Sequence, residues 1–219
     1  EVSEMRVDNI NMLNDTMAIL DRGYYEVNGK RVNLKLSKAE MKEISVFLPK
    51  DVKSISDNKD FQHIHMMGGR IGVDCVNMDS YSLAIKRYSD CSYMFSKKSK
   101  PILVLNLANP VNPGGGVRRG SKAQEEDLCR KSSLLLSLES SAASVYYKYN
   151  KSLNTYMGSD AVMVTPQVEI IKDENGSLLD ESVIVSVMTC AAPMLRNGME
   201  GLTDQEYRDM VYGRITGML

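Results

Sequence analysis

Four short apolar runs, separated by stretches with helical spacing, dominate the chain from Gly72 onward. The runs predict strands over residues 73–78, 102–107, 161–165 and 183–188. Helices are expected over residues 81–89, 124–149 with a break near 139–141, and 203–218. Between the last two strands, residues 168–172 and 177–179 flank Asp173-Glu174-Asn175-Gly176, a turn typical of a hairpin. Such alternation favours an α/β fold, a central sheet with helices on both faces.

The first third of the chain has a different pattern. Apolar residues from Met5 to Leu20 are spaced as in an amphipathic helix, and residues 24–36 predict a hairpin that turns at Asn28-Gly29. Residues 37–40 can cap a short helix, and the polar residues 49–60 predict a surface connection. We therefore expect an N-terminal helix and hairpin extension over residues 1–70 and a catalytic core over residues 71–219.

Composition excludes several classes of protein. With 219 residues, 43% of them apolar, the chain can build one well-packed core. A formal net charge of −1 argues against a strongly electrostatic partner, so we expect no direct DNA binding. No apolar run approaches the ~18 residues of a membrane span. The four cysteines are far apart in the sequence, which favours reduced thiols and a cytoplasmic location.

The segment with the clearest chemical meaning is Asn109-Pro-Val-Asn-Pro-Gly-Gly-Gly116, followed by Gln124-Glu125-Glu126. Glycines adopt φ > 0 without strain and expose backbone N–H groups, so a ligand can lie directly on the main chain. Backbone N–H groups near the start of a helix favour phosphate. Because the three polar residues fall in the first turn of a predicted helix, two acids would lie beside a loop that suits a phosphorylated ligand.

The loop and the acids together resemble the signature of the microbial-type poly(ADP-ribose) glycohydrolases. The resemblance extends from about Gly72 to Pro193, and the segments that carry it, besides the loop and the acids, are Val104-Leu105-Asn106-Leu107-Ala108, Leu128-Cys129-Arg130-Lys131-Ser132-Ser133, Val162-Met163-Val164-Thr165-Pro166 and Leu178-Leu179-Asp180-Glu181. It implies a macrodomain-like mixed sheet flanked by helices. The implied activity is hydrolysis of ribose–ribose O-glycosidic bonds, which releases ADP-ribose from the ends of poly(ADP-ribose).

The resemblance also assigns roles to residues. Cleavage of this bond expels a poor alkoxide leaving group, so a carboxylic acid must deliver a proton. That task falls to Glu126, which then takes a proton from the attacking water, while Glu125 holds the ribose hydroxyls. The other expected substrate contacts are Asn109 and Asn112 at the terminal ribose, Gln124 on the adenosine side, and the loop glycines Gly114, Gly115 and Gly116. The expected partner is poly(ADP-ribose) or an ADP-ribosylated protein.

Each feature also has a purely structural explanation. A run of glycines commonly forms a turn, acids in a first helical turn commonly complement the helix dipole, and asparagines commonly satisfy backbone groups in turns. Two other functions therefore stay open, an ADP-ribose reader that does not hydrolyse its ligand and an inactive truncated fragment. The two acids after the triple glycine favour the enzyme.

No cofactor or metal is expected. His63 and His65 are the only histidines, and no third ligand accompanies them in the sequence. Cys129 follows Glu126 by one turn and is expected to be a small packing residue rather than a nucleophile. The cluster Tyr146, Tyr147 and Tyr149 is expected to belong to the core and its rim.

The predicted helix 203–218 is the last element of the chain. Members of the resembled family continue with a further strand, a second glycine-rich phosphate loop and a closing helix. We therefore expect an apparently truncated C-terminal end, with an apolar strand edge exposed in an isolated monomer. This edge predicts self-association, or association with a chain that supplies the segment.

Overall fold

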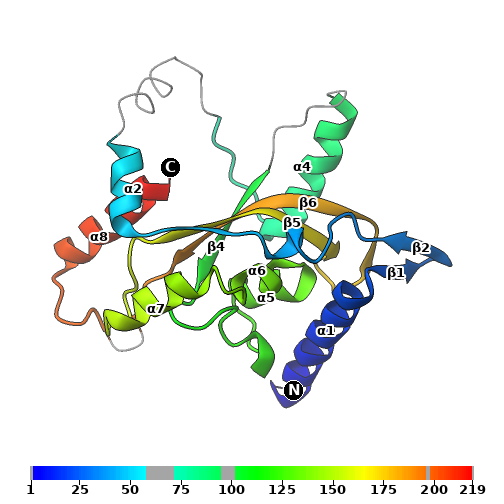
Figure 1. The fold of residues 1–219 in the computed structure, drawn as a ribbon, viewed down its shortest axis with the longest axis horizontal. Coiled ribbons are helices and arrows are strands. Elements are labelled where there is room, and N and C mark those ends of the chain that lie inside the picture. The colour runs from blue at the N-terminus through cyan, green and yellow to red at the C-terminus, as the bar shows by residue number, and fades with distance from the viewer. Residues whose placement is uncertain (1, 58–71, 95–101, 196–197, 219) are drawn as a thin grey trace.

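The computed structural model describes residues 2–57, 72–94, 102–195 and 198–218. Its centre is a mixed four-stranded sheet with helices on both faces, as the alternation of apolar runs predicts (Figure 1). The strand order is β3-β5-β6-β4; β3 pairs antiparallel with β5, β5 antiparallel with β6, and β6 parallel with β4. The strands are β3 Ser45–Phe47, β4 Leu103–Ala108, β5 Val162–Lys172 and β6 Leu178–Ala191.

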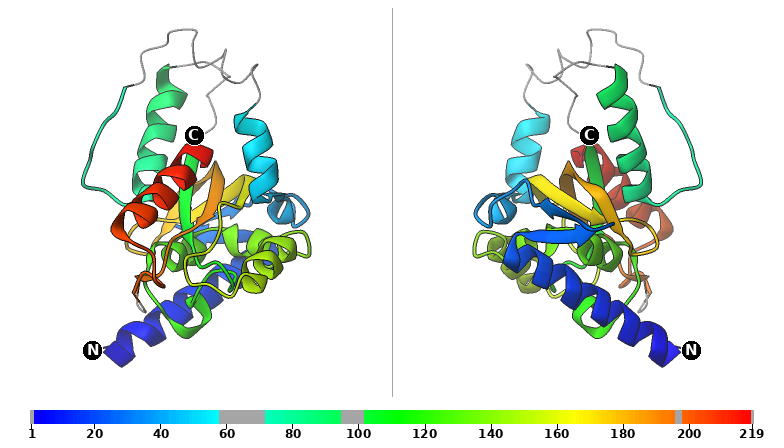
Figure 2. Two further views of the ribbon diagram at one scale, coloured as in Figure 1. Left: turned by 90° about the vertical axis from the view of Figure 1, so that its left-hand side faces the viewer. Right: turned by 90° about the vertical axis from the view of Figure 1, so that its right-hand side faces the viewer.

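Helices cover the two faces of the sheet through separate apolar clusters. The main cluster packs β4, β5 and β6 against α5 (Gln124–Lys131), α6 (Leu134–Leu138), α7 (Ser144–Ser152) and the start of α4 (Ser80–Met94). A smaller cluster around Val162 and Cys190 receives Val52 from α2 (Pro49–Ser56) and Met218 from α8 (Asp204–Met218). In the two side views, α2 lies above the sheet, and α5, α6 and α7 lie below it (Figure 2).

The N-terminal part packs against the rest of the molecule. It comprises α1 (Val2–Arg22), the antiparallel hairpin of β1 (Tyr24–Val27) and β2 (Lys30–Asn33), and the one-turn helix η1 (Glu40–Lys42). These elements agree with the predicted helix, hairpin and capped turn. Leu13 of α1 belongs to the main cluster, and β3 is a strand of the central sheet. The division at residues 70 and 71 falls among residues outside the described ranges and stays a prediction.

Three predicted elements differ from the structure. Residues 73–78 form no strand, and Val73 is 88% exposed, because no neighbouring strand pairs with this segment in the described ranges. The segment after Phe47 is a helix rather than a surface connection, because Pro49 opens α2 and the Asp51 side chain accepts the N–H of Leu48 at 2.9 Å. The helical stretch predicted over residues 124–149 with one break near 139–141 is three helices, because a further break lies between α5 and α6.

The extra break between α5 and α6 has a tertiary cause. Ser133 N–H donates to the Glu169 carbonyl at 3.0 Å, and the Glu169 N–H donates to the Ser133 hydroxyl at 2.9 Å. Ser132 forms an isolated bridge with Ile170 of β5. The sheet therefore draws these two serines out of the helix, whereas the second break, at residues 139–143, lies where the sequence predicts it.

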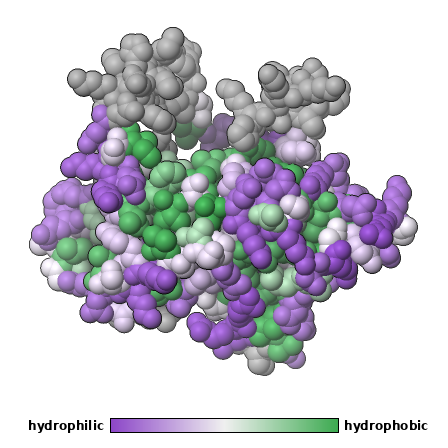
Figure 3. All heavy atoms as spheres, in the orientation of Figure 1, coloured by the Kyte–Doolittle hydropathy of each residue, from purple (hydrophilic) through white to green (hydrophobic). Residues whose placement is uncertain are grey.

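The surface mixes polar and apolar residues, with apolar side chains gathered across the middle of the face in Figure 3. Within the described ranges, no helix is long and apolar enough to cross a membrane.

Candidate active site

A tight loop joins β4 to α5 and carries the three glycines. At its start, the Asn109 side-chain oxygen accepts the N–H groups of Val111 and Asn112 at 3.0 and 2.9 Å, which folds an Asx turn. Gly114 and Gly115 have φ of +65° and +58°, values that side chains rarely tolerate. A Cβ on Gly114 would lie 2.7 Å from Leu135 Cδ1, so the loop is packed onto the core.

Glu125 and Glu126 turn back from α5 to bind this loop. Glu126 Oε1 accepts the N–H of Gly116 at 2.8 Å, and Glu125 Oε2 accepts the N–H of Asn109 at 2.7 Å. A Cβ on Gly115 would lie 2.6 Å from Glu126 Oε1 and 3.1 Å from Glu125 Oε2. The two carboxyl groups therefore converge on one glycine, although adjacent helical positions point about 100° apart. Capping of their own helix alone does not account for these contacts.

Both carboxyl groups are buried, and each has spare bonding capacity. Glu125 is 3% exposed and Glu126 is 7% exposed. Glu125 Oε1 and Glu126 Oε2 have no hydrogen-bond partner within the described part of the chain. A buried carboxylate oxygen without a partner costs free energy, so this arrangement is typical of a site that a ligand completes.

The two acids differ in their electrostatic surroundings. The pKa of Glu125 is raised to about 7, chiefly by burial. The N–H of Asn109 opposes this rise, the charge of Glu126 adds to it, and the Asn106 side chain and the Gly114 backbone oppose it more weakly. The neighbouring hydroxyls of Tyr146 and Tyr147 are also buried, and burial together with the Glu125 charge raises the pKa of each. These tyrosines stay neutral and belong to the core, as the sequence predicts.

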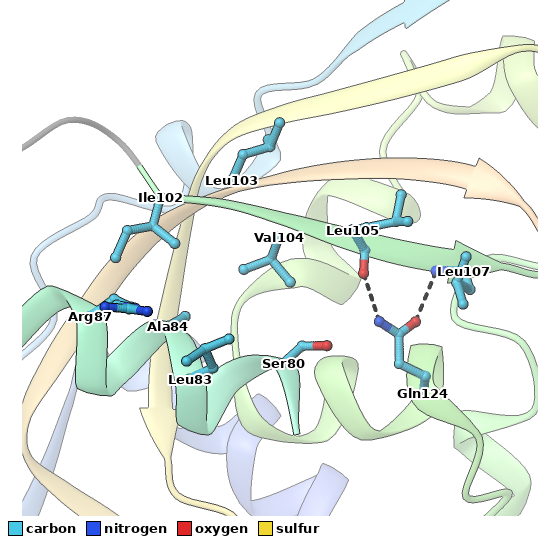
Figure 4. Close-up of a pocket in the computed structure, with 10 residues that line it drawn as sticks. All are labelled: Ser80, Leu83, Ala84, Arg87, Ile102, Leu103, Val104, Leu105, Leu107 and Gln124. Atoms are coloured by element: carbon cyan, nitrogen blue, oxygen red, sulfur yellow. Dashed lines mark hydrogen bonds between the residues drawn. The ribbon is translucent and has the colours of Figure 1, made fainter. Parts of the chain in front are cut away.

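The other predicted contacts surround the acids to different degrees. Asn109 is half-buried, Asn112 is exposed, and Asn106 is buried with its amide nitrogen 3.2 Å from Thr189 Oγ1. Gln124 bonds to the free edge of β4, where its nitrogen donates to the Leu105 carbonyl at 2.6 Å and its oxygen accepts the Leu107 N–H at 2.8 Å (Figure 4). Gln124 thus imitates a neighbouring strand.

Two of the glycine N–H groups that the sequence predicts to face a ligand already have hydrogen-bond partners within the protein. The Gly115 N–H donates to the Asn112 carbonyl at 3.0 Å, and the Gly116 N–H is used by Glu126. Arg118 forms a two-pronged ion pair with Glu139, with N–O distances of 2.8 to 3.0 Å, and so directs its charge away from the acids. A phosphate on this loop would have to replace such bonds or use other groups.

One support of the loop has no signal in the sequence. Asn9 of α1 donates to the Gly120 carbonyl at 2.9 Å, across 111 positions of sequence. Gly120 has a φ of +75°, and a Cβ there would lie 2.5 Å from the Arg6 carbonyl oxygen. Arg130 holds the next residue, because its Nη1 donates to the Ser121 carbonyl. The far end of the loop is therefore fixed between α1 and α5.

Metal-binding groups are not gathered anywhere in the described ranges, where no three His, Cys, Asp or Glu side chains could hold an ion. His63 and His65 lie outside these ranges. Cys129 is fully buried, and burial raises the pKa of its thiol, which agrees with the predicted packing role.

Solved structures share this fold. The poly(ADP-ribose) glycohydrolase of Thermomonospora curvata bound to the inhibitor ADP-HPD superposes with a TM-score of 0.78 and 25% identity, over 96% of this chain and 72% of that one. The Deinococcus radiodurans poly(ADP-ribose) glycohydrolase in complex with ADP-ribose has a TM-score of 0.66 and 26% identity, over 89% of this chain and 70% of that one. The fold is thus that of a poly(ADP-ribose) glycohydrolase.

The family model described as microbial-type PARG, catalytic domain, matches residues 14–173, and the chain belongs to this family. The match contains the loop, both acids and the first part of the sheet. A comparison with curated proteins finds no match.

Proposed function

We propose that this chain hydrolyses the ribose–ribose O-glycosidic bonds of poly(ADP-ribose) and releases ADP-ribose from chain ends, without a metal. Its partners are then poly(ADP-ribose) or ADP-ribosylated proteins. Membership of the microbial-type family supports the substrate class. The observation that carries the proposal is the convergence of two buried carboxyl groups on Gly115, each with one oxygen left for a ligand.

In the proposed reaction, Glu126 protonates the leaving ribose oxygen while positive charge develops at the anomeric carbon. The same carboxylate then takes a proton from the incoming water. Glu125 holds the hydroxyls of the terminal ribose through Oε1, while Oε2 stays bound to Asn109. The Gly116 N–H holds Glu126 Oε1, which leaves Oε2 for the proton transfer, and because Oε2 is buried the loop has to open for the substrate to reach it.

Glu125 is the competing candidate for the acid. Because burial raises its pKa to about 7, Glu125 carries a proton in a large fraction of molecules at neutral pH. General acids work best when their pKa lies near the working pH. The amide variant of each residue distinguishes the two assignments.

The test is release of ADP-ribose from poly(ADP-ribose), with ADP-ribose affinity measured by calorimetry on the same preparations. Glu126→Gln is expected to lower turnover by about 10²–10⁴-fold and to leave affinity within a few-fold, since the amide keeps the shape but cannot deliver a proton. Glu125→Gln is expected to weaken ligand affinity as well as turnover. The exposed Glu26→Gln on the hairpin is the matched control. Wild-type turnover by Glu126→Gln would remove Glu126 from the mechanism.

An ADP-ribose reader without hydrolysis is the second candidate. It is favoured by the hydrogen bonds from Asn109 to Glu125 and from Gly116 to Glu126, because carboxyl groups that hold the loop in shape can serve binding without any proton transfer. The same assay decides between the two: a reader binds ADP-ribose and releases none from the polymer, even after prolonged incubation with a large excess of protein.

A further inference from the structure

A cleft with a volume of about 290 Å³ adjoins the loop that carries the three glycines. One wall is the start of the loop, from Asn109 to Asn112. The opposite wall comes from the end of α7 and the segment after it, including Asn150, Lys151 and Tyr156, and Met194 completes the lining.

The walls of the cleft are fixed by hydrogen bonds and close packing. The Tyr156 carbonyl accepts the Met194 N–H at 3.0 Å, and the Tyr156 N–H donates to Glu200 Oε1 at 2.9 Å. A Cβ on Gly158 would lie 2.5 Å from Ala191 Cβ and 3.4 Å from Pro110 Cβ, so this strand connection passes directly behind the loop. The cleft is therefore a built feature rather than a gap beside a loose segment.

The groups that face the cleft have the chemistry of a nucleotide site. Asn150 is 1% exposed, and its Oδ1 has no hydrogen-bond partner in the described ranges, while its nitrogen donates to the Tyr146 carbonyl at 3.0 Å. Tyr156 is 51% exposed and offers an aromatic surface, and Lys151 is exposed on the rim. An acceptor, an aromatic surface and a cation suit a hydroxyl or amino group, a base and a phosphate.

A hydrogen bond connects the lining of the cleft to the acid pair. Asn109 lines it and donates its N–H to Glu125 Oε2, whereas Gly116, at the other end of the glycine run, donates to Glu126. The cleft therefore adjoins the acid pair at the Asn109 end of the loop, whereas Gly116 lies outside its lining. When the terminal ADP-ribose is held on the glycine side, the unit beyond the scissile bond faces the cleft.

We propose that this cleft binds the nucleotide on the leaving side of the scissile bond, with its base on Tyr156, a polar group at Asn150 and its phosphate near Lys151. This inference rests on the proposed substrate, because only a polymer has a second nucleotide. It makes the second unit, as well as the terminal one, a determinant of affinity.

The test compares two ligands in the Glu126→Gln background, which is expected to slow hydrolysis by about 10²–10⁴-fold, and the dimer is checked for cleavage after each titration. ADP-ribose and its ribose-linked dimer are titrated by calorimetry. Stacking of one base predicts that the dimer binds about tenfold more tightly than ADP-ribose. Adding Tyr156→Ala is expected to abolish this ratio, and adding Lys151→Ala to reduce it at low salt. Tyr212→Ala, an exposed tyrosine of α8 outside the cleft, should keep the ratio.

Equal affinities for dimer and monomer, or a ratio that survives Tyr156→Ala, would overturn the cleft assignment. Neither result depends on turnover. Failure of the wild-type protein to release ADP-ribose would instead reject the proposed hydrolysis, and a dimer preference that persists beside it would identify a two-unit reader.

Discussion

At the scale of single residues, the burial of Glu125 couples folding to pH. Its pKa rises from 4.5 to about 7 in the folded protein. Between these values the folded state keeps a proton that the unfolded chain releases. The contribution of protonated Glu125 to the free energy of unfolding is therefore fully present below about pH 4.5. It is lost as pH rises toward 7, by up to about 3 kcal/mol.

Glu125→Gln removes this titration. We expect the variant to gain stability relative to the wild type as pH rises from 4.5 to 7.5, measured by urea unfolding at each pH. Because other groups titrate equally in both proteins, the difference between the two curves isolates Glu125. Parallel curves would show that Glu125 has an ordinary pKa in the folded protein.

Gly115 allows a second test at this scale. Its φ of +58° would strain any side chain, and a Cβ would lie 2.6 Å from Glu126 Oε1. Gly23 has a φ of +81° and nothing within 4 Å of a Cβ, so it provides the same kind of backbone strain without the contact. Gly115→Ala and Gly23→Ala should each lose about 1–2 kcal/mol of stability.

Only Gly115→Ala is expected to lose turnover as well, because the new methyl group displaces the Glu126 carboxyl group. Melting temperature and ADP-ribose release are measured for both variants. Equal turnover in the two variants would mean that Gly115 serves the turn and not the acid.

At the scale of elements, α1 supports the loop that holds the acids. Asn9 binds the Gly120 carbonyl, and the Ser121 N–H in turn donates to the Gly116 carbonyl at 3.2 Å. Asn9→Ala should therefore lower turnover by between about twofold and tenfold, with a stability loss of about 1 kcal/mol. Asn11→Ala, at an exposed position of the same helix, is the control. Turnover that falls equally in both variants would assign the effect to the helix as a whole.

The same scale separates what the sequence could and could not predict. Local patterns were sufficient for α1, the hairpin at Asn28-Gly29 and the turn before Ser177, because caps, turn residues and periodicity act within a few positions. They failed at residues 73–78, where an apolar run pairs with no strand of the part of the chain that the structure describes. They also missed the break at Ser132 and Ser133, which depends on Glu169 in a distant strand.

The site divides in the same way. The motif located Glu125, Glu126 and the glycines in one loop and helix turn, and the structure brings them together. The inward turn of both carboxyl groups onto Gly115 could not be predicted, because helical spacing alone separates them. The contact between Asn9 and Gly120 joins segments that share no local pattern. The roles of these residues in binding and catalysis stay predictions.

At the scale of the whole molecule, β4 is an edge strand, with an apolar side, of the sheet that the described residues form. Leu103, Leu105 and Leu107 are 54%, 37% and 49% exposed. The carbonyls of Ile102 and Ala108 accept N–H groups from the β6 side. Backbone groups of successive residues in a strand point in opposite directions, so those of Leu103, Leu105 and Leu107 point away from β6. Gln124 covers only the Leu105 carbonyl and the Leu107 N–H (Figure 4). Edge strands of this kind pair readily with another chain.

We therefore propose that copies of this chain associate through the β4 edge. Light scattering should show a mass that rises with protein concentration, because each new strand contact buries leucine side chains and satisfies free backbone groups. Leu105→Lys should keep the protein monomeric, since a lysine on an edge strand opposes pairing. Val7→Lys, at a 54% exposed position of α1, should leave the association unchanged. A wild-type protein that stays monomeric at high concentration and binds ADP-ribose tightly would contradict the proposal, because the exposed edge would then need no partner for a working site.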